Sequence, residues 1–330
     1  MRIGVIGAGA VGGAIAARLA SRGHAVRVTA RGEHLAAIRA SGIHLRGAWG
    51  DETVALEANE LLEPGVELAI VATKAHDAAR AIQSNAVALE GVPVLVIQNG
   101  LAAIDSARAL LPRNELFGGL AMFASSYLAA GSITVTAPGP TFVGGSNERL
   151  GRELCTALAP IDARFEPNLE GAQWSKLVVN QINALPAITG LSAQEVIAHD
   201  GLRRIMVASM RETVRVGRAR GIRFASVSGL SHGLLRAFEF APFGLAQTLP
   251  KQMAKRMGDT PNPGSTLQSI KRGQLTEIDF LNGAVVAEAA LAGGFAPINA
   301  ALQSLVHEVE TSGHFLTAAD VTRRLARAIS

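Results

Sequence analysis

The sequence has 330 residues, of which 48% are hydrophobic and 18% are charged, a composition typical of a compact soluble protein and unlike a long disordered chain. Because a single hydrophobic core rarely extends past about 250 residues, this length predicts two domains. The formal net charge of +4 is scattered along the chain, so no nucleic-acid-binding arm is expected. The only cysteine, Cys155, excludes an intrachain disulfide and a cysteine-based zinc site, and it favours a reducing, cytoplasmic location.

Short β-rich runs alternate with helical patterns in the first part of the chain. We expect buried strands at RIGVIG, AVRVTA, ELAIVAT and VPVLVIQ, and helices at residues 10–22, 33–41, 76–88 and 101–111. This alternation predicts an α/β domain with a parallel, doubly wound sheet of the Rossmann type, which we place at residues 1–167. Between residues 116 and 145 the pattern changes to β-branched runs with turn signals, which we interpret as added strands that close this domain.

From about residue 168 the sequence becomes helical. Long amphipathic patterns cover residues 170–188, 202–220, 279–293 and 297–311. Residues 168–330 are therefore expected to form a mostly α-helical second domain that carries the substrate site. The segment GDTPNPGST, residues 258–266, is expected to be an exposed loop. No stretch reaches about 18 uninterrupted apolar residues, so no transmembrane helix and no membrane partner are expected.

A glycine-rich motif joins the first predicted strand to the first predicted helix. Its residues, in a G-x-G-x-x-G pattern, are Gly7, Ala8, Gly9, Ala10, Val11 and Gly12. Between a strand and a helix, such glycines let the backbone approach a pyrophosphate at the helix N-terminus. The motif therefore predicts a dinucleotide site, and the alternative is a strand–helix turn that is merely tight.

Three polar side chains follow the carboxyl ends of predicted strands. A dinucleotide site usually has an acid after the second strand, but here Arg31 stands at that place, and an arginine suits a 2′-phosphate. Lys74 would supply a second cation, so the two residues predict NADP(H) as the cofactor. The amide of Asn99 would reach the nicotinamide or a substrate. The alternatives are solvated surface charges for Arg31 and Lys74 and turn chemistry for Asn99 and Gly100.

The segment WSKLVVNQINALPAITG, residues 174–190, embeds polar residues in an apolar helical pattern. On a continuous helix, Lys176, Asn180 and Asn183 occupy positions i, i+4 and i+7 and project from one face. A partly desolvated lysine has a lowered pKa and can donate a proton, and amides can orient the oxygens of a substrate. The alternative is a solvent-exposed stripe on an ordinary amphipathic helix.

A second polar cluster, STLQSIKRGQLTEIDFLNG, spans residues 265–283. Glu277 and Asp279 lie near the start of a predicted helix, where carboxylates interact favourably with the helix dipole, and we expect that role for Asp279. The eight histidines are dispersed, and none has the helical two-ligand spacing with a third ligand nearby. No metal site is therefore expected.

The order of these motifs resembles the ketopantoate reductase (2-dehydropantoate 2-reductase) family over nearly the whole chain. The matching segments are GAGAVGG, TAR with Arg31, TKA with Lys74, QNG with Asn99, WSKLVVNQINAL and TEIDFLNG. The resemblance implies that Lys176 is the general acid and that Glu277 binds the hydroxyl group of the substrate. It also implies that Asn99, Asn180 and Ser265 contact the substrate or the cofactor.

The sequence departs from the family pattern at two places. Asn183 follows Asn180 by three residues, where some relatives have a spacing of four, and Ser269 occupies a place often held by an aspartate.

The activity that the resemblance implies is NADPH-dependent reduction of a small 2-oxo acid, 2-dehydropantoate, to pantoate. A β-hydroxyacid dehydrogenase acting on another small acid is one alternative, and a non-catalytic NADP(H)-binding redox sensor is another. The TEID segment and the lack of an acid after the second strand favour the reductase over the dehydrogenase. The presence of both Lys176 and Glu277 argues against the sensor. The oligomeric state is left open, and a homodimer is among the options.

Overall fold

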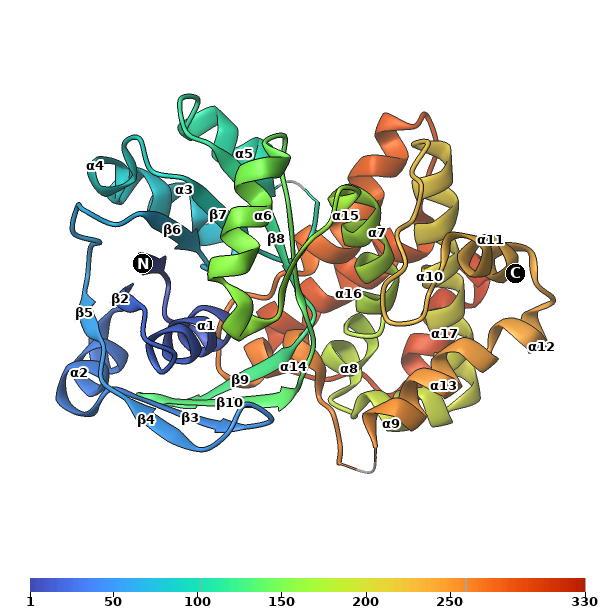
Figure 1. Ribbon diagram of the computed structural model, residues 1–330. Coiled ribbons are helices and arrows are strands. Elements are labelled where there is room, and N and C mark those ends of the chain that lie inside the picture. Colours follow the sequence, from blue (N-terminus) through green and yellow to red (C-terminus); the bar gives the residue numbers. More distant parts are fainter. Residues whose placement is uncertain (102, 259, 330) are drawn as a thin grey trace. The chain divides into compact units, whose positions relative to one another are not determined.

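The computed structural model describes residues 1–101, 103–258 and 260–329, and it divides into two compact units, Met1–Leu169 and Glu170–Ser330. The main sheet of the first unit comprises β1 (Arg2–Ile6), β2 (Ala25–Thr29), β5 (Glu57–Asn59), β6 (Leu68–Val71), β7 (Val94–Ile97), β8 (Leu116–Ala121), β11 (Thr141–Gly144) and β12 (Ala163–Phe165). Their order is β12-β11-β8-β7-β6-β1-β2-β5, and only the β8–β11 pair is antiparallel (Figure 1).

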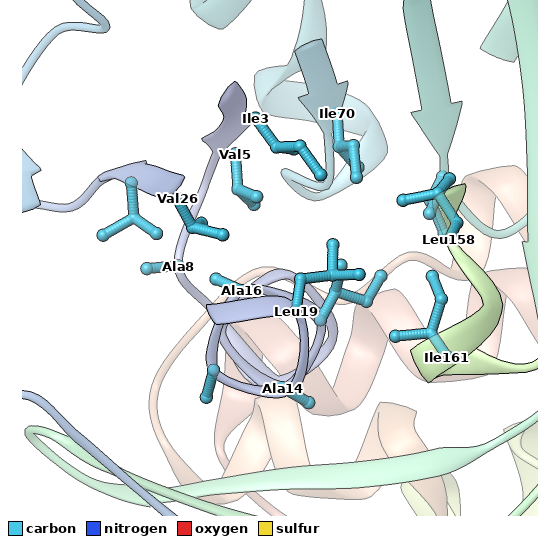
Figure 2. Packing of buried hydrophobic residues seen from close by; sticks show 14 of the residues in the cluster. Ile3, Val5, Ala8, Ala14, Ala16, Leu19, Val26, Ile70, Leu158 and Ile161 are labelled. Carbon is cyan, nitrogen blue, oxygen red and sulfur yellow. The ribbon is translucent and has the colours of Figure 1, made fainter. Parts of the chain in front are cut away.

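Two hydrophobic cores cover the two faces of this sheet. The helices of the unit are α1 (Ala10–Ala20), α2 (Gly32–Ser41), α3 (Ala75–Ser84), α4 (Ala86–Leu89), α5 (Ala103–Leu110) and α6 (Glu148–Ala157). Ile3, Val5 and Ile70 point toward α1, where Leu19 packs against the sheet (Figure 2). Alternate residues such as Val71 point to the opposite face, covered by α3, α4 and α5. Because both faces are covered, the central strands are apolar throughout, as parallel strands usually are.

A second, four-stranded sheet packs on the outer side of α1. Its strands are β3 (Ile43–Gly47), β4 (Glu52–Val54), β9 (Ala124–Ala129) and β10 (Ser132–Ala137), in the order β4-β3-β10-β9. The approach is close, because a Cβ atom added to Gly13 of α1 would lie 2.1 Å from the Cδ1 atom of Ile133 in β10. The strands expected between residues 116 and 145 are confirmed, whereas the sequence patterns do not predict β3, β4, β5 or β12.

The second unit is helical. Its helices are α7 (Leu169–Asn180), α8 (Ala184–Thr189), α9 (Ala193–Ala198), α10 (Asp200–Ala219), α11 (His232–Phe240), α12 (Phe243–Ala246), α13 (Thr248–Met257), α14 (Gly264–Lys271), α15 (Ile278–Leu291), α16 (Pro297–Ser312) and α17 (Ala318–Ile329). The long helix α10 contacts α9, α11, α15, α16 and α17 and forms the centre of this unit. A Rossmann-type sheet followed by a mostly α-helical region confirms the predicted fold class.

Three predictions about helix boundaries are wrong. The single helix expected over residues 76–88 is divided at Asn85, where α3 ends and α4 begins. The continuous helix expected over residues 170–188 is interrupted, because α7 ends at Asn180 and α8 begins at Ala184. Pro186 is the physical reason: in a continuous helix it would donate no hydrogen bond, and its ring would clash with the carbonyl group of Ile182. The loop expected at residues 258–266 is shorter, since α14 begins at Gly264.

Two residues of the predicted segments, Ala102 and Asp259, lie outside the described residues. In the part of the chain that the structure describes, no helix combines the length and the apolar character needed to cross a membrane.

Candidate active site

The glycine-rich loop between β1 and α1 is shaped by close backbone contacts. Gly7 has a φ angle of +97°, and a Cβ atom on it would meet the Cγ2 atom of Thr73 at 2.8 Å. A Cβ atom on Gly12 would lie only 2.0 Å from the carbonyl oxygen of Gly7. Side chains at either position would therefore force the strand and the helix apart, so only glycines permit this tight turn.

Gly9 leaves space at the start of α1. It is the N-cap residue of α1, and a Cβ atom added to it would meet nothing within 4 Å. The first backbone N–H groups of a helix have no acceptor within the helix, and they carry a partial positive charge. Nearby, the Oγ1 atom of Thr73 is buried and has no hydrogen-bond partner among the described residues. This combination of free space, N–H donors and a polar atom fits the pyrophosphate of a dinucleotide.

The other predicted cofactor residues lie at the same edge of the main sheet. Arg31 follows β2 at the N-cap position of α2, Lys74 follows β6 at the N-cap position of α3, and Asn99 follows β7. The strands β1, β2, β6 and β7 are parallel, so their carboxyl ends share one edge. Arg31 is exposed, and its guanidinium has no partner among the described residues, whereas Lys74 and Asn99 are half-buried.

His34 supports this loop, although no sequence motif includes it. From α2, its Nδ1 atom accepts a 3.0 Å hydrogen bond from the backbone N–H of Gly131, which forces the ring proton onto Nε2. Nε2 then donates to the carbonyl oxygen of Ala8 at 2.6 Å. Burial lowers the pKa of His34, which agrees with a neutral ring. A histidine on an amphipathic helix carries no pattern that would have indicated this role.

In the second unit, Lys176 and Asn180 lie one turn apart on α7, and both side chains are half-buried. Burial lowers the pKa of Lys176 to about 8, and the negative charge of Glu277 opposes this shift. A lysine with this pKa is still mostly protonated near neutral pH, yet it gives up its proton more readily than an exposed lysine.

The predicted alignment of Lys176, Asn180 and Asn183 on one helix is wrong for Asn183. The helix ends at Asn180, and Asn183 is the N-cap residue of α8. Its Nδ2 atom donates to the carbonyl oxygen of Asn180 at 3.1 Å. Its Oδ1 atom faces Gly264, where an added Cβ atom would lie 2.5 Å away. This contact brings the turn after α7 to the start of α14, where Ser265 is exposed in the first turn.

Glu277 occupies the N-cap position of α15 and is half-buried. The preceding residue, Thr276, donates its backbone N–H to the Oε1 atom of Glu310 at 2.8 Å. Asp279 lies in the first turn of α15, as predicted, and its Oδ1 atom accepts hydrogen bonds from His307 at 2.8 Å and Gln303 at 2.6 Å. The segment that carries Glu277 is therefore fastened to α16 on both sides.

A buried polar network, which no sequence pattern predicted, connects the WSKLVVNQINAL and TEIDFLNG segments of the second unit. The Oε1 atom of Gln181 accepts hydrogen bonds from Ser209 at 2.7 Å and from Asn282 at 2.8 Å. Asn299 contacts both Ser209 and Asn282, and its side chain and backbone donate to the carboxylate of Glu212. The only sequence signal was that Gln181 and Asn282 occur inside the WSKLVVNQINAL and TEIDFLNG segments.

One hollow on the second unit is lined by other residues. Its volume is about 280 Å³, and it is lined by Gly190, Ser192, Glu195, Pro261, Pro263, Leu267 and Lys271. Neither Lys176 nor Glu277 lines it, so we do not regard it as the reaction site. Among the described residues, no group of three or more potential protein ligands is arranged to hold a metal ion.

Two family models match the chain. The model described as "Ketopantoate reductase PanE/ApbA" matches residues 3–148, and the model described as "Ketopantoate reductase PanE/ApbA C terminal" matches residues 168–310. The chain belongs to the ketopantoate reductase family. This finding confirms the resemblance seen in the sequence and identifies the protein as an oxidoreductase.

Several individual ketopantoate reductases are similar to the chain. A 2-dehydropantoate 2-reductase of Pyrococcus horikoshii is 28% identical over 320 residues, which cover 95% of this chain and 99% of the relative. The crystal structure of a PanE/ApbA family ketopantoate reductase from Ralstonia eutropha JMP134 superposes with a TM-score of 0.78 at 29% identity, covering 94% and 99% of the two chains.

A more distant structure shares the fold of these ketopantoate reductases. D-mandelate dehydrogenase in complex with NADH and anilino(oxo)acetate has a TM-score of 0.80 at 22% identity, covering 94% of this chain and 99% of that one.

Proposed function

We propose that this protein is an NADPH-dependent 2-dehydropantoate 2-reductase, which converts 2-dehydropantoate to pantoate. The observation that carries the proposal is Lys176, a half-buried lysine whose pKa is lowered to about 8 by burial, although the negative charge of Glu277 raises it. Such a group suits proton donation to a developing alkoxide near neutral pH. The family assignment and the curated relatives named 2-dehydropantoate 2-reductase support the same reaction.

Residues 1–167, which lie within the first unit, are proposed to bind NADP(H). The backbone of Gly7, Ala8, Gly9, Ala10, Val11 and Gly12 receives the pyrophosphate at the N-terminus of α1. Arg31 and Lys74 bind the 2′-phosphate, because two cations at this edge of the sheet form charge-assisted hydrogen bonds with a dianion. Asn99 orients the nicotinamide or the substrate. The bound nicotinamide supplies the hydride that C2 of the 2-oxo acid accepts.

Residues 168–330, which include the whole second unit, are proposed to bind the substrate and complete the reduction. The C2 oxygen gains negative charge as C2 is reduced, and Lys176 stabilises this charge and then transfers its proton to that oxygen. Glu277 accepts a hydrogen bond from the hydroxyl group at the other end of the substrate, and Ser265 binds the carboxylate. Asn180 orients the substrate oxygens, and Asn183 contributes by holding the turn that follows Asn180.

The absorbance of NADPH, followed over a panel of 2-oxo acids, tests this function. We expect turnover with 2-dehydropantoate and a loss of at least about 100-fold in Lys176→Ala, the usual scale for removing a general acid. Lys255→Ala, which removes an exposed lysine on α13, is the matched control and should retain activity. If NADPH is oxidised with another 2-oxo acid but not with 2-dehydropantoate, the substrate assignment is refuted. If no 2-oxo acid of the panel supports turnover, the result favours a non-catalytic NADP(H)-binding protein.

Substrate recognition by Glu277 is tested separately with an analogue of 2-dehydropantoate that lacks the hydroxyl group. The measured quantity is the ratio of kcat/KM for 2-dehydropantoate to kcat/KM for this analogue. We call this quantity the hydroxyl preference. With the analogue, the wild-type site leaves the Glu277 carboxylate without its substrate partner, which is costly for a half-buried charge. Glu277→Ala should therefore lower the hydroxyl preference, and an unchanged preference would show that Glu277 does not bind the hydroxyl.

A further inference from the structure

Four residues form a chain of hydrogen bonds around the segment that carries Glu277. The backbone N–H of Thr276 donates to the Oε1 atom of Glu310 at 2.8 Å, and the Oε2 atom of Glu310 lies 2.6 Å from the Nδ1 atom of His307. The Nε2 atom of His307 lies 2.8 Å from the Oδ1 atom of Asp279. We call Thr276, Asp279, His307 and Glu310 the His307 bridge. It fastens the chain one residue before Glu277 and two residues after it.

The two ring nitrogens of His307 require a proton each. Both face carboxylate oxygens, which only accept hydrogen bonds, so only the imidazolium form can donate to Asp279 and Glu310 at the same time. Burial lowers the pKa of His307, but the hydrogen bonds and the negative charges of the two carboxylates outweigh burial, and the net shift is upward. The bridge is therefore assembled when His307 is charged.

Other charged groups around α16 are engaged elsewhere. On α17, Arg324 pairs with Glu308 at 2.7 Å, and on α10, Glu212 accepts hydrogen bonds at the opposite end of α16 from Ile298 and Asn299. Helix α8, which also packs against α16, has the sequence ALPAIT and no titratable side chain. The groups facing the His307 ring are thus Asp279 from α15 and Glu310 from α16 itself.

We propose that His307 is a positioning residue for substrate recognition: by holding Asp279 and Glu310, it fixes the backbone from which Glu277 meets the substrate hydroxyl. This inference rests on the proposed role of Glu277. His307 touches neither substrate nor cofactor in the proposal. The backbone of Glu277 has φ −100° and ψ 24°, outside the regular helix. The hydrogen bonds made by Thr276 and Asp279 on either side therefore determine the direction of the Glu277 side chain.

The bridge makes recognition of the hydroxyl depend on pH. Because the pKa of His307 is raised in the folded protein, its contribution is complete below the ordinary histidine pKa of about 6.5 and is lost as the pH rises through the higher folded value. The hydroxyl preference should fall over that range. Titration of Lys176 affects the reduction of both substrates equally, so it cancels in this ratio.

The kinetic test compares the wild type with His307→Phe, which keeps a ring but removes both hydrogen bonds. We expect about a tenfold rise in KM for 2-dehydropantoate, the equivalent of one lost charged hydrogen bond, with kcat changed less than about twofold. The hydroxyl preference should fall and no longer depend on pH, and adding His307→Phe to Glu277→Ala should not lower it further. His314→Phe, at an exposed histidine on the segment after α16, is the control.

Amide hydrogen exchange at Thr276 tests the bridge without any substrate. Its N–H should exchange about tenfold faster in His307→Phe than in the wild type, because Glu310 is no longer held as the acceptor. Unchanged exchange would overturn the positioning role even if 2-dehydropantoate is the substrate. Faster exchange with an unchanged hydroxyl preference would also overturn it. If no 2-oxo acid is reduced at all, the proposed function fails first, and the recognition role fails with it.

Discussion

The Oε1 atom of Gln181 accepts a 2.8 Å hydrogen bond from the Nδ2 atom of Asn282, and this bond joins the turn after α7 to α15. Both side chains are fully buried. Lys176 lies on α7 and Glu277 begins α15, so the bond connects the elements that carry the two proposed catalytic residues. Inside a protein such a bond holds the helices in one register, because any shift would leave buried amides unpaired.

Replacing Gln181 by leucine should therefore destabilise the second unit by about 3 kcal/mol, because Ser209 and Asn282 both lose an acceptor in a buried site. Urea unfolding followed by the fluorescence of Trp174, in a Trp49→Phe background, measures this unit separately. Gln252→Leu, at an exposed position of α13, is the control. A Gln181→Leu variant as stable as the control would show that the network contributes little.

Gly9→Ala and Gly12→Ala should differ in stability although both should weaken nucleotide binding. The Gly12 variant would place its Cβ atom 2.0 Å from the Gly7 carbonyl oxygen, so its melting temperature should fall. The Gly9 variant meets nothing within 4 Å and should melt like the wild type, yet its methyl group fills the space proposed for the pyrophosphate. Nucleotide titration together with thermal melting tests this, and normal NADPH affinity in Gly9→Ala would contradict the proposed site.

Arg31→Ala should reduce the preference for NADPH over NADH by about tenfold or more, since a charged hydrogen bond to the 2′-phosphate is lost. The affinity for NADH, which lacks this phosphate, should change little. Dissociation constants of the two nucleotides, measured for the wild type, Arg31→Ala and the exposed control Arg22→Ala, provide the comparison. Equal affinities for NADPH and NADH in the wild type would rule out the assignment of NADP(H).

The alkaline limit of turnover should reflect Lys176. Its pKa is about 8, so kcat/KM should be level below that pH and fall about tenfold per pH unit above it, as the acid form disappears. Because the charge of Glu277 raises this pKa, Glu277→Gln should move the break to a lower pH. A pH profile with the same break in both proteins would mean that another group limits the reaction.

Strands and helices that are indicated by one short sequence motif could be predicted from the sequence. The glycine motif after an apolar strand indicated β1, α1 and β2 correctly. By contrast, β3 has the sequence IHLRG and pairs with β10, which lies far along the chain, so no local pattern indicated that these strands form a separate second sheet. The break after α7 did have a signal, since Pro186 is tolerated in the first turn of a helix but not in the interior of one that continues from α7.

In the candidate site, too, residues within a local sequence motif could be predicted, whereas contacts between distant parts of the chain could not. Lys176 and Glu277 could be selected because each is embedded in a recognisable segment. The roles of Gln181 and His34 depend on partners that are distant in sequence: Gln181 and Asn282 are 101 residues apart, and His34 and Gly131 are 97 apart. A polar residue on a helix gives no indication of such a partner until the fold brings the two together.

The contact between Gly13 of α1 and Ile133 of β10 has a consequence for biosynthesis. Strand β3 also contacts this outer face of α1, but β3 pairs with β10, so the cover is complete only after β10 has been translated, roughly 120 residues after Gly13. At a synthesis rate of about 5–20 residues per second, the cover of this face stays incomplete on the nascent chain for roughly 10 s. During that interval the beginning of the Rossmann sheet can form, but part of the outer face of its first helix stays exposed to solvent until β10 docks.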